Sequence, residues 1–507
     1  MTYLIRGGFV LTMQDGFGSD GIIKGGAVYV SGNQIVEVGR YKALKARYPT
    51  ATVLGSPRFW VMPGFVNAHQ HGKGLTNFQL GGLDEPFELS RVKGSPQAKA
   101  PPYLDTLYAA LRMIEAGITT CLHYNASRGT AFYESDVSER MRAYRDAGLR
   151  VSFGLDIRNR NHLVYGDDEF LAILPPDLRE RARERTTKSR TADPANYFRL
   201  AETLDEQFSH ETEGRIKLFL APAGPQWCTE DLLRSIRQFA DARHLGIQIH
   251  TLETRYQRAY FLRSYGHTAV EWLDGLGFLS PQLSLAHGVW FSARDISLVA
   301  QRGCAVVHNP SSNLRLKSGI APLALFHAAG IPVALGLDSS ALNDDMDMLQ
   351  EMRLCANLQR TPGISAPTVS PKDILAMATT NGSKILGWGN RSGTLEPGKD
   401  ADIVLIDSER LREPYLAPQQ SPMDALIYRG QASDVDTVMV AGEILYQRKK
   451  HRKLDSHAVL KQLRASIEPA AASATATLDA QLLPHMIRYY QDWDNETLTP
   501  HHIVNGL

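Results

Sequence analysis

A repeated unit in the middle of the chain constrains the fold more than any other feature. Between residues 60 and 338, a short apolar segment, a loop with polar residues and a helix-like stretch follow one another eight times. Eight such units over about 280 residues match the usual size of a (βα)8 barrel, so the sequence predicts an α/β protein with a TIM-type barrel. The expected barrel strands are Trp60–Val66, Ile118–Tyr124, Arg150–Asp156, Ile216–Ala221, Gly246–Thr251, Leu283–His287, Cys304–His308 and Pro332–Asp338.

The two ends of the chain have a different pattern. Short apolar runs alternate with turns from Tyr3 to about Thr52, and a similar texture returns in residues 393–407 and 437–446. Because chain termini often lie close together, we expect residues 1–58 and 393–450 to form one small β-sandwich beside a barrel of residues 59–392. Residues 451–507 are expected to form a helical C-terminal extension, for which the sequence leaves a subunit contact and a flap open.

Composition excludes several classes of partner. The net charge of +1 over 507 residues gives no electrostatic footprint for nucleic acid or for an anionic membrane. No apolar run is long enough to span a bilayer, and the first residues lack the pattern of a signal peptide. The four cysteines lie far apart, without the spacing of a metal site. We therefore expect a cytoplasmic enzyme that acts on a small molecule, as a dimer or tetramer.

Polar residues stand at the ends of four predicted barrel strands. His69 and His71 are two positions apart at the end of the first strand, so both side chains lie on one face. His250 ends the fifth strand, His287 the sixth and Asp338 the eighth. Each residue alone is as often structural as functional, but barrel active sites are built at these strand ends. Together the residues predict a site for a divalent metal ion.

The residue types in this set indicate a hydrolytic reaction. A mixed imidazole and carboxylate set with an open position is typical of catalytic metal sites, where the ion makes a bound water acidic enough to yield hydroxide. Asp338 can bind the ion and accept the proton of the water, while His287 steers the water by a hydrogen bond. Glu253 follows His250 at the barrel mouth, where a carboxyl group can donate a proton to a ring nitrogen. Zinc is the expected ion, and iron or manganese fits the same donors.

Residues 1–450 resemble the amidohydrolase superfamily. The motifs that carry this resemblance are Pro63-Gly-Phe-Val-Asn-Ala-His-Gln-His, His250-Thr-Leu-Glu-Thr, Leu285-Ala-His-Gly-Val-Trp, residues 307–322, Leu335-Gly-Leu-Asp-Ser-Ser and residues 395–404. Within the superfamily, the chain is similar to the branch that contains triazine hydrolases, S-adenosylhomocysteine deaminases and 8-oxoguanine deaminases. Many members of this branch have Cys where this chain has Gly288, a difference that concerns the substrate and not the metal.

The resemblance implies one ion and assigns a role to each polar residue. His287 would bind the attacking water, and Glu253 would be the acid of the mononuclear aminohydrolases. Binuclear relatives carry a carbamylated lysine at the end of strand four, where this chain reads Ala221-Pro-Ala-Gly and Lys217 lies near the strand's start. The implied metal ligands are His69, His71, His250 and Asp338.

These features favour hydrolytic deamination, or release of an amine, from a nitrogen heterocycle. The same site could cleave a cyclic amide, a urea or a carbamate, and a barrel without activity could serve as a scaffold or binding subunit. Six residues near the strand ends are candidates for substrate contact, although each is as often a packing or surface residue. They are Gln70, Tyr124, Arg158, Trp227, Arg255 and His308.

Overall fold

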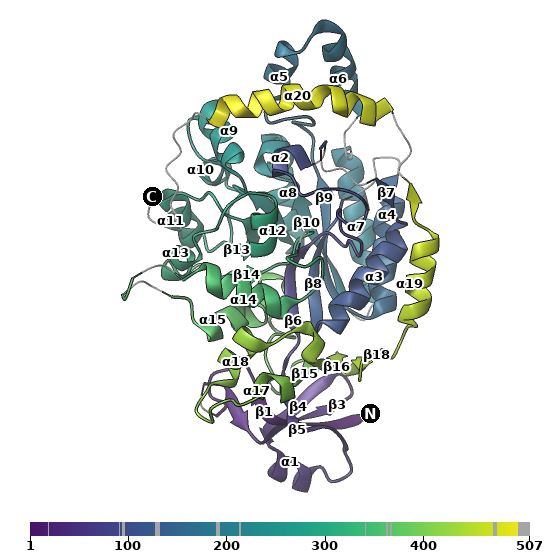
Figure 1. Ribbon diagram of the computed structural model, residues 1–507, viewed down its shortest axis with the longest axis vertical. Helices are drawn as coiled ribbons and strands as arrows, with labels where there is room; N and C mark the ends of the chain where they lie inside the picture. Colours follow the sequence, from purple (N-terminus) through teal and green to yellow (C-terminus); the bar gives the residue numbers. More distant parts are fainter. Residues whose placement is uncertain are drawn as a thin grey trace.

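Eight parallel strands form the nearly closed barrel that the repeated unit predicts (Figure 1). The computed structural model describes residues 1–18, 20–90, 92–93, 97–126, 132–188, 193–211, 214–339, 341–360, 363–365, 368–469 and 474–494. In the sheet, β14 is followed in order by β13, β12, β11, β10, β9, β8 and β6, each hydrogen-bonded to the next. The strands are β6 (Phe65–Gln70), β8 (Ile118–Tyr124), β9 (Arg150–Ile157), β10 (Ile216–Pro222), β11 (Gly246–Thr251), β12 (Leu283–His287), β13 (Ala305–His308) and β14 (Val333–Leu335).

Helices follow the strands and cover the outside of the barrel (Figure 1). Their apolar faces join the outward-facing side chains of the strands in one large core cluster. The helices from β6 to β11 are α2 (Phe87–Ser90), α3 (Pro102–Glu115), α4 (Tyr133–Ala147), α5 (Asp167–Ile173), α6 (Pro176–Lys188), α7 (Pro194–Glu211) and α8 (Glu230–Arg243). Those after β11 are α9 (Arg255–Tyr265), α10 (Ala269–Gly275), α11 (Ala293–Gln301), α12 (Pro310–Arg315), α13 (Leu323–Ala328), α14 (Met348–Leu358), α15 (Pro371–Met377) and α16 (Thr380–Ile385).

The barrel closes where its last strand meets its first. The backbone N–H of Asp338 donates to the carbonyl of His69 at 2.8 Å, and that of Leu337 donates to the side-chain oxygen of Asn67 at 3.0 Å. Gly336 makes this approach possible, because a Cβ there would lie 2.7 Å from the Cβ of His69. The closure therefore brings the carboxylate of the eighth strand to the histidines of the first.

The N-terminal and C-terminal segments of the chain form one continuous mixed sheet of nine strands, which lies below the barrel in Figure 1. Apolar residues from its N-terminal and C-terminal strands share a core cluster, which includes Ile5, Val28 and Ile403. The strands are β1 (Thr2–Leu11), β2 (Ile22–Lys24), β3 (Gly26–Ser31), β4 (Gln34–Arg40), β5 (Thr52–Pro63), β15 (Ile403–Asp407), β16 (Val435–Val440), β17 (Glu443–Gln447) and β18 (Lys450–His451). The short helices α1 (Tyr41–Arg47), α17 (Glu409–Arg412) and α18 (Pro422–Arg429) lie between these strands in the sequence.

The first barrel strand begins later than the sequence predicts. The expected strand Trp60–Val66 is divided, because β5 runs to Pro63 and pairs with β1 and β15 of the terminal sheet. The barrel strand β6 starts at Phe65, after Gly64. We therefore place the boundary between the two bodies at Gly64 and not after residue 58. The start of the barrel strands thus faces the terminal sheet.

The C-terminal extension runs along the barrel and across its opposite end (Figure 1). Helix α19 (Ser456–Ala465) packs on α3, and β19 (Glu468–Pro469) pairs with β7 (Ala98–Lys99). Helix α20 (Ala474–Asp494) then contacts α2, α6 and α9, near the end where the barrel strands finish. Residues 470–473 and 495–507 of the expected extension lie outside the described residues. In the described part of the chain, no helix has the length and apolar character to cross a bilayer.

Candidate active site

Four imidazoles and one carboxylate converge at the ends of the barrel strands. The ring centroid of His69 lies 5.2 Å from that of His71, 4.9 Å from that of His250 and 5.5 Å from that of His287. Oδ1 of Asp338 lies 3.2 Å from Nε2 of His71 and 3.9 Å from Nε2 of His69. The structure thus brings together all five residues that the strand ends predict.

Each imidazole has a hydrogen-bond partner at Nδ1. Nδ1 of His69 lies 2.6 Å from Oε1 of Gln248, and Nδ1 of His287 lies 2.8 Å from Oδ1 of Asn313. Gln248 is held in turn, since its amide donates to the carbonyl of Ala68 at 3.1 Å. Such acceptors fix the ring orientation and place the proton on Nδ1, as is usual for histidines that bind metal. Neither Gln248 nor Asn313 was predicted as a site residue, although Gln248 lies in the predicted fifth strand and Asn313 in the motif of residues 307–322.

The remaining two histidines are held by backbone carbonyls. Nδ1 of His71 lies 3.0 Å from the carbonyl oxygen of Tyr124, and Nδ1 of His250 lies 2.8 Å from that of Ala223. With Nδ1 occupied, the lone pair of each Nε2 is available to the centre of the cluster. Burial lowers the pKa of His69 to about 3 and that of His250 well below its usual range, so both rings are neutral at physiological pH.

The donor atoms fit one divalent ion. Ligand atoms of His69, His71 and His250 lie within 4.8 Å of one another, and so do those of His69, His287 and Asp338. Among the described residues, Nε2 of His69 is buried without a hydrogen-bond partner. A buried ring nitrogen with a free lone pair, surrounded by other ligand atoms, costs folding free energy unless an ion or a water molecule satisfies it. Neutral imidazole and carboxylate donors are the ligands that zinc and similar ions prefer.

Asp338 is ionised despite its burial. Burial acts against its charge, but the hydrogen bond to His71 and the nearby imidazoles hold the pKa of Asp338 well below its usual range. The hydroxyl of Ser312 donates to its Oδ2 at 2.6 Å, and the N–H of Ser339 donates to its Oδ1 at 2.7 Å. The charged carboxylate can therefore both bind a cation and accept a proton.

Glu253 has the opposite character. It is fully buried, and burial together with the charges of Asp338 and Glu88 raises the pKa of Glu253 well above its usual range. Its Oε2 lies 3.8 Å from Nε2 of His287 and has no hydrogen-bond partner among the described residues. Its Oε1 accepts from Ser318 at 3.3 Å. The site thus holds a buried carboxyl group beside His287 whose raised pKa favours the protonated form, which can donate.

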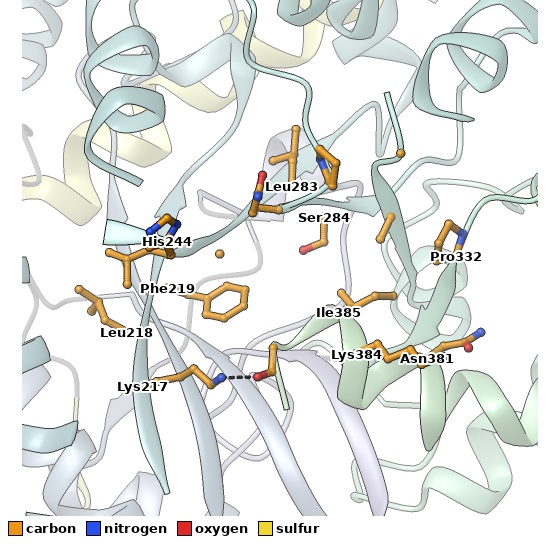
Figure 2. A pocket seen from close by; sticks show the side chains of 17 residues that line it. Lys217, Leu218, Phe219, His244, Leu283, Ser284, Pro332, Asn381, Lys384 and Ile385 are labelled. Carbon is orange, nitrogen blue, oxygen red and sulfur yellow. Dashed lines mark hydrogen bonds between the residues drawn. The ribbon is translucent and has the colours of Figure 1, made fainter. Parts of the chain in front are cut away.

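The lysine of strand four lies at the other end of the barrel. Lys217 lines a cavity of about 410 Å³ where strands β10 to β13 begin (Figure 2). Its amine donates to the carbonyl of Gly387 and lies 3.8 Å from the ring centroid of Trp388. The end of strand four, residues 221–224, carries no side chain that binds metals. Lys217 therefore lies at the wrong end of the barrel to bridge a second ion beside the cluster.

Two of the six candidate substrate-contact residues instead hold other residues of the site in place. Gln70 points away from the cluster, because its amide donates to the hydroxyl of Tyr144 at 2.9 Å. The prediction that Gln70 contacts substrate therefore does not fit the structure. The hydroxyl of Tyr124 donates to the carbonyl of Pro222 at 2.7 Å, and its ring packs 4.3 Å from that of His250. Tyr124 thus holds a predicted ligand in place.

The other four candidates lie around the end of the barrel. His308 is fully buried at the end of β13, and half-buried Arg158 follows β9. Trp227 is buried after β10, with its ring 5.9 Å from that of Phe87. Half-buried Arg255 begins α9 two residues after Glu253. These positions are compatible with substrate contact, which stays a prediction.

Comparisons with known proteins relate the whole barrel to one family. The model of the amidohydrolase family matches residues 60–445, and that of a bacterial imidazolonepropionase-like composite domain matches residues 26–51. A 5'-deoxyadenosine deaminase of Methanosarcina mazei is 29% identical over 476 residues, which cover 92% of this chain and 98% of the relative. A 5-methylthioadenosine/S-adenosylhomocysteine deaminase of Syntrophomonas wolfei is 31% identical over 453 residues, with 88% and 95% covered.

Solved structures share the architecture. The crystal structure of an adenosine deaminase from Xanthomonas campestris with bound zinc has a TM-score of 0.77 and 26% identity, and the match covers 91% of this chain and 97% of that one. An atrazine chlorohydrolase from Arthrobacter aurescens, in complex with zinc and atraton, also has a TM-score of 0.77 and covers 91% and 99%. Its identity is 22%, so this second likeness concerns the fold alone.

Proposed function

The chain belongs to the amidohydrolase family, and we propose that it is a metal-dependent aminohydrolase that releases ammonia or an amine from a nitrogen heterocycle. The observation that carries this proposal is the placement of two buried carboxyl groups, Asp338 and Glu253, 3.9 Å and 3.8 Å from Nε2 of His287, with pKa shifts that favour the ionised form of the first and the protonated form of the second. Deamination of an amidine-like carbon needs both states at once, since one group must accept a proton while another donates one.

We assign the metal to the donors that the barrel ends bring together. His69, His71, His250 and Asp338 would hold one divalent ion, and the zinc in the similar adenosine deaminase supports zinc as its identity. When bound, such an ion supplies a Lewis acid that lowers the pKa of a water molecule at the site. The Nδ1 hydrogen bonds of the three histidines would hold their Nε2 atoms in place for it.

The chain's own residues then move the protons. Asp338 accepts a proton from the attacking water, and Nε2 of His287 accepts a hydrogen bond from the same water and orients it. Glu253 donates its proton to the ring nitrogen while the water oxygen bonds to the adjacent carbon. The proton on Asp338 passes to the exocyclic amine, which leaves as ammonia, and the ring keeps a carbonyl group. As the C–N bond breaks, the second proton of the water, on the new hydroxyl group, returns to Glu253, so both protons and the oxygen of the water are accounted for.

The relatives suggest a finer substrate class. Because the two sequence relatives are named as deaminases of adenosine derivatives, we propose a purine nucleoside derivative as the first substrate to test. Cleavage of a cyclic amide, urea or carbamate is the alternative, and the protonated Glu253 favours deamination over it. An inactive scaffold is disfavoured by the complete set of polar groups. A cytoplasmic location and a dimer or tetramer stay predictions.

A release assay tests this proposal. We expect purified protein to release ammonia from at least one of adenosine, 5'-deoxyadenosine, 5-methylthioadenosine and S-adenosylhomocysteine, with the ring retained. Guanine, pterins, triazines and cyclic ureas complete the panel, and mass spectrometry of the product separates amine release from ring opening. Ring-opened products without ammonia would replace the proposal by the cyclic amide alternative, and metal-loaded protein that acts on none of the panel would contradict deamination of these rings.

The metal content provides an independent test. We expect about one equivalent of divalent ion per chain, since the ligand atoms form one cluster and Lys217 lies at the opposite end of the barrel. Elemental analysis after removal of loosely bound metal measures this ratio. Two equivalents that persist would contradict a mononuclear site, whatever the substrate.

A further inference from the structure

The C-terminal helix α20 holds a loop of the barrel by two adjacent tyrosines. The hydroxyl of Tyr490 accepts from the backbone N–H of Tyr165 at 3.1 Å, and that of Tyr489 donates to the carbonyl of Tyr165 at 2.9 Å. Tyr165 lies in the loop between β9 and α5 and is 2% exposed. Both backbone groups of one buried residue are thus satisfied by side chains that lie 324 and 325 positions away in the sequence.

The side chain of Tyr165 continues these contacts toward Glu253. Its hydroxyl donates to Oε1 of Glu88 on α2 at 3.1 Å and accepts from the amide of Gln257 at 3.4 Å. Gln257 is fully buried, and its Oε1 accepts from the backbone N–H of Glu253 at 2.8 Å. A continuous chain of hydrogen bonds therefore runs from α20 through Tyr165 and Gln257 to the proposed proton donor.

Glu88 forms further hydrogen bonds with residues of this network. Its Oε1 also accepts from the hydroxyl of Thr254, the residue that follows Glu253 and caps the first turn of α9. Burial raises the pKa of Glu88 to about 7, and its charge contributes to the raised pKa of Glu253. Helix α2, helix α9 and the Tyr165 loop therefore meet at one polar cluster beside the proton donor.

We propose that α20 helps to position the proton donor of the active site. Tyr489 and Tyr490 fix Tyr165, and Gln257 and Glu88 then hold the segment around Glu253 in the position from which it can donate its proton. This inference rests on the proposed function for the role of Glu253. Tyr165, Tyr489 and Tyr490 act as positioning residues, because their contacts reach the donor through Gln257 and Glu88. The alternative is a helix that only covers apolar surface.

The polar chain argues against simple covering. A helix that only buries apolar surface would be held by ring contacts such as that of Tyr489 with Phe170 of α5, whose centroids lie 5.5 Å apart. Here the two hydroxyl groups of α20 bond to the backbone of Tyr165, and the hydroxyl group of Tyr165 bonds to Glu88 and Gln257. In a buried network each lost partner leaves a polar group unsatisfied. A substitution on α20 should therefore alter the position of the Glu253 segment.

Two tyrosine variants test the inference. Tyr165→Phe removes only the hydroxyl that joins Glu88 and Gln257, and the double variant Tyr489→Phe/Tyr490→Phe removes the hold of α20. In both we expect kcat to fall by roughly tenfold with KM changed by less than about twofold and with metal content unchanged. Hydrogen exchange of the peptide that covers residues 250–257 should be faster by roughly tenfold, because the N–H of Glu253 is held by Gln257.

A control on the same helix separates positioning from docking. Gln481 is exposed on α20 and accepts from Arg181 of α6 at 2.7 Å, so Gln481→Ala weakens docking without changing the bonds of Tyr165. We expect wild-type kcat and exchange in this variant. Exchange and kcat at wild-type values in metal-loaded Tyr165→Phe would overturn the inference, as would an equal loss in Gln481→Ala. If the wild-type protein released no amine, the proposed function would fail, and the exchange measurement alone would still decide this inference.

Discussion

Asp338→Asn should lower turnover by about a thousandfold while the metal stays bound, within the range for loss of a group that transfers a proton. An amide can still offer an oxygen to the ion, but it carries no charge and accepts no proton at useful pH. In the native chain, His71 and the nearby imidazoles keep the pKa of Asp338 low, so the carboxylate is ionised throughout the working range. Metal content and kcat measured on the same sample separate the two roles.

Histidine variants provide the controls for this result. His69→Ala and His71→Ala should empty the site, because each removes a donor from the cluster that the first strand anchors. His287→Asn should resemble Asp338→Asn, with metal retained and turnover low, since its proposed task is to orient water. Near-normal turnover of metal-loaded Asp338→Asn would show that another group accepts the proton, and Glu253 would be the first to examine.

Glu253→Gln should keep the fold and the metal and lower turnover by roughly a hundredfold or more. The substitution is nearly isosteric, and it removes a buried carboxyl group whose pKa lies well above its usual range. An amide can donate a hydrogen bond to the ring nitrogen but cannot transfer its proton. Ser318→Ala is the matched control, since it removes only the 3.3 Å hydrogen bond to Oε1 and should cost far less.

The outcome of Glu253→Gln bears directly on the proposed reaction. With full activity, Glu253 would be a supporting residue, and deamination would lose its main argument against cleavage of a cyclic amide. Unfolding temperature and elemental analysis of the variant must match the wild type before the rates are compared. A variant that loses its metal would instead show that the buried carboxyl supports the ligands.

The barrel and its polar strand ends could be predicted because both follow from local patterns. The expected strands Ile118–Tyr124, Gly246–Thr251 and Leu283–His287 coincide with β8, β11 and β12. A buried parallel strand reads as an apolar run, and the polar residue that ends it lies at the carboxyl end of the barrel. The same alternation places Gln70 on the face opposite His69, so its role in support could have been predicted too.

Other features depend on contacts that no local pattern records. Trp60 to Val66 reads as one apolar run, and only the pairing of β5 with β1 and β15 divides it at Gly64. The partner of His69 is Gln248, which lies 179 positions away, and Tyr165 meets Tyr490 across 325 positions. Sequence spacing cannot reveal which polar groups become neighbours when the intervening chain folds, so the hold of α20 on the site was not predicted.

The closure of the barrel has a consequence for how the protein matures. The four proposed metal ligands come from the first, fifth and eighth strands, and the N–H of Asp338 bonds to the carbonyl of His69 itself. A nascent chain that ends before residue 338 therefore lacks the carboxylate of the cluster, however well its earlier strands have paired. An ion that binds the finished set links the first strand to the last and favours the closed barrel by mass action. Metal capture by the complete set would then be one of the last events of biogenesis, and a chain released before residue 338 would lack one of the four proposed ligands.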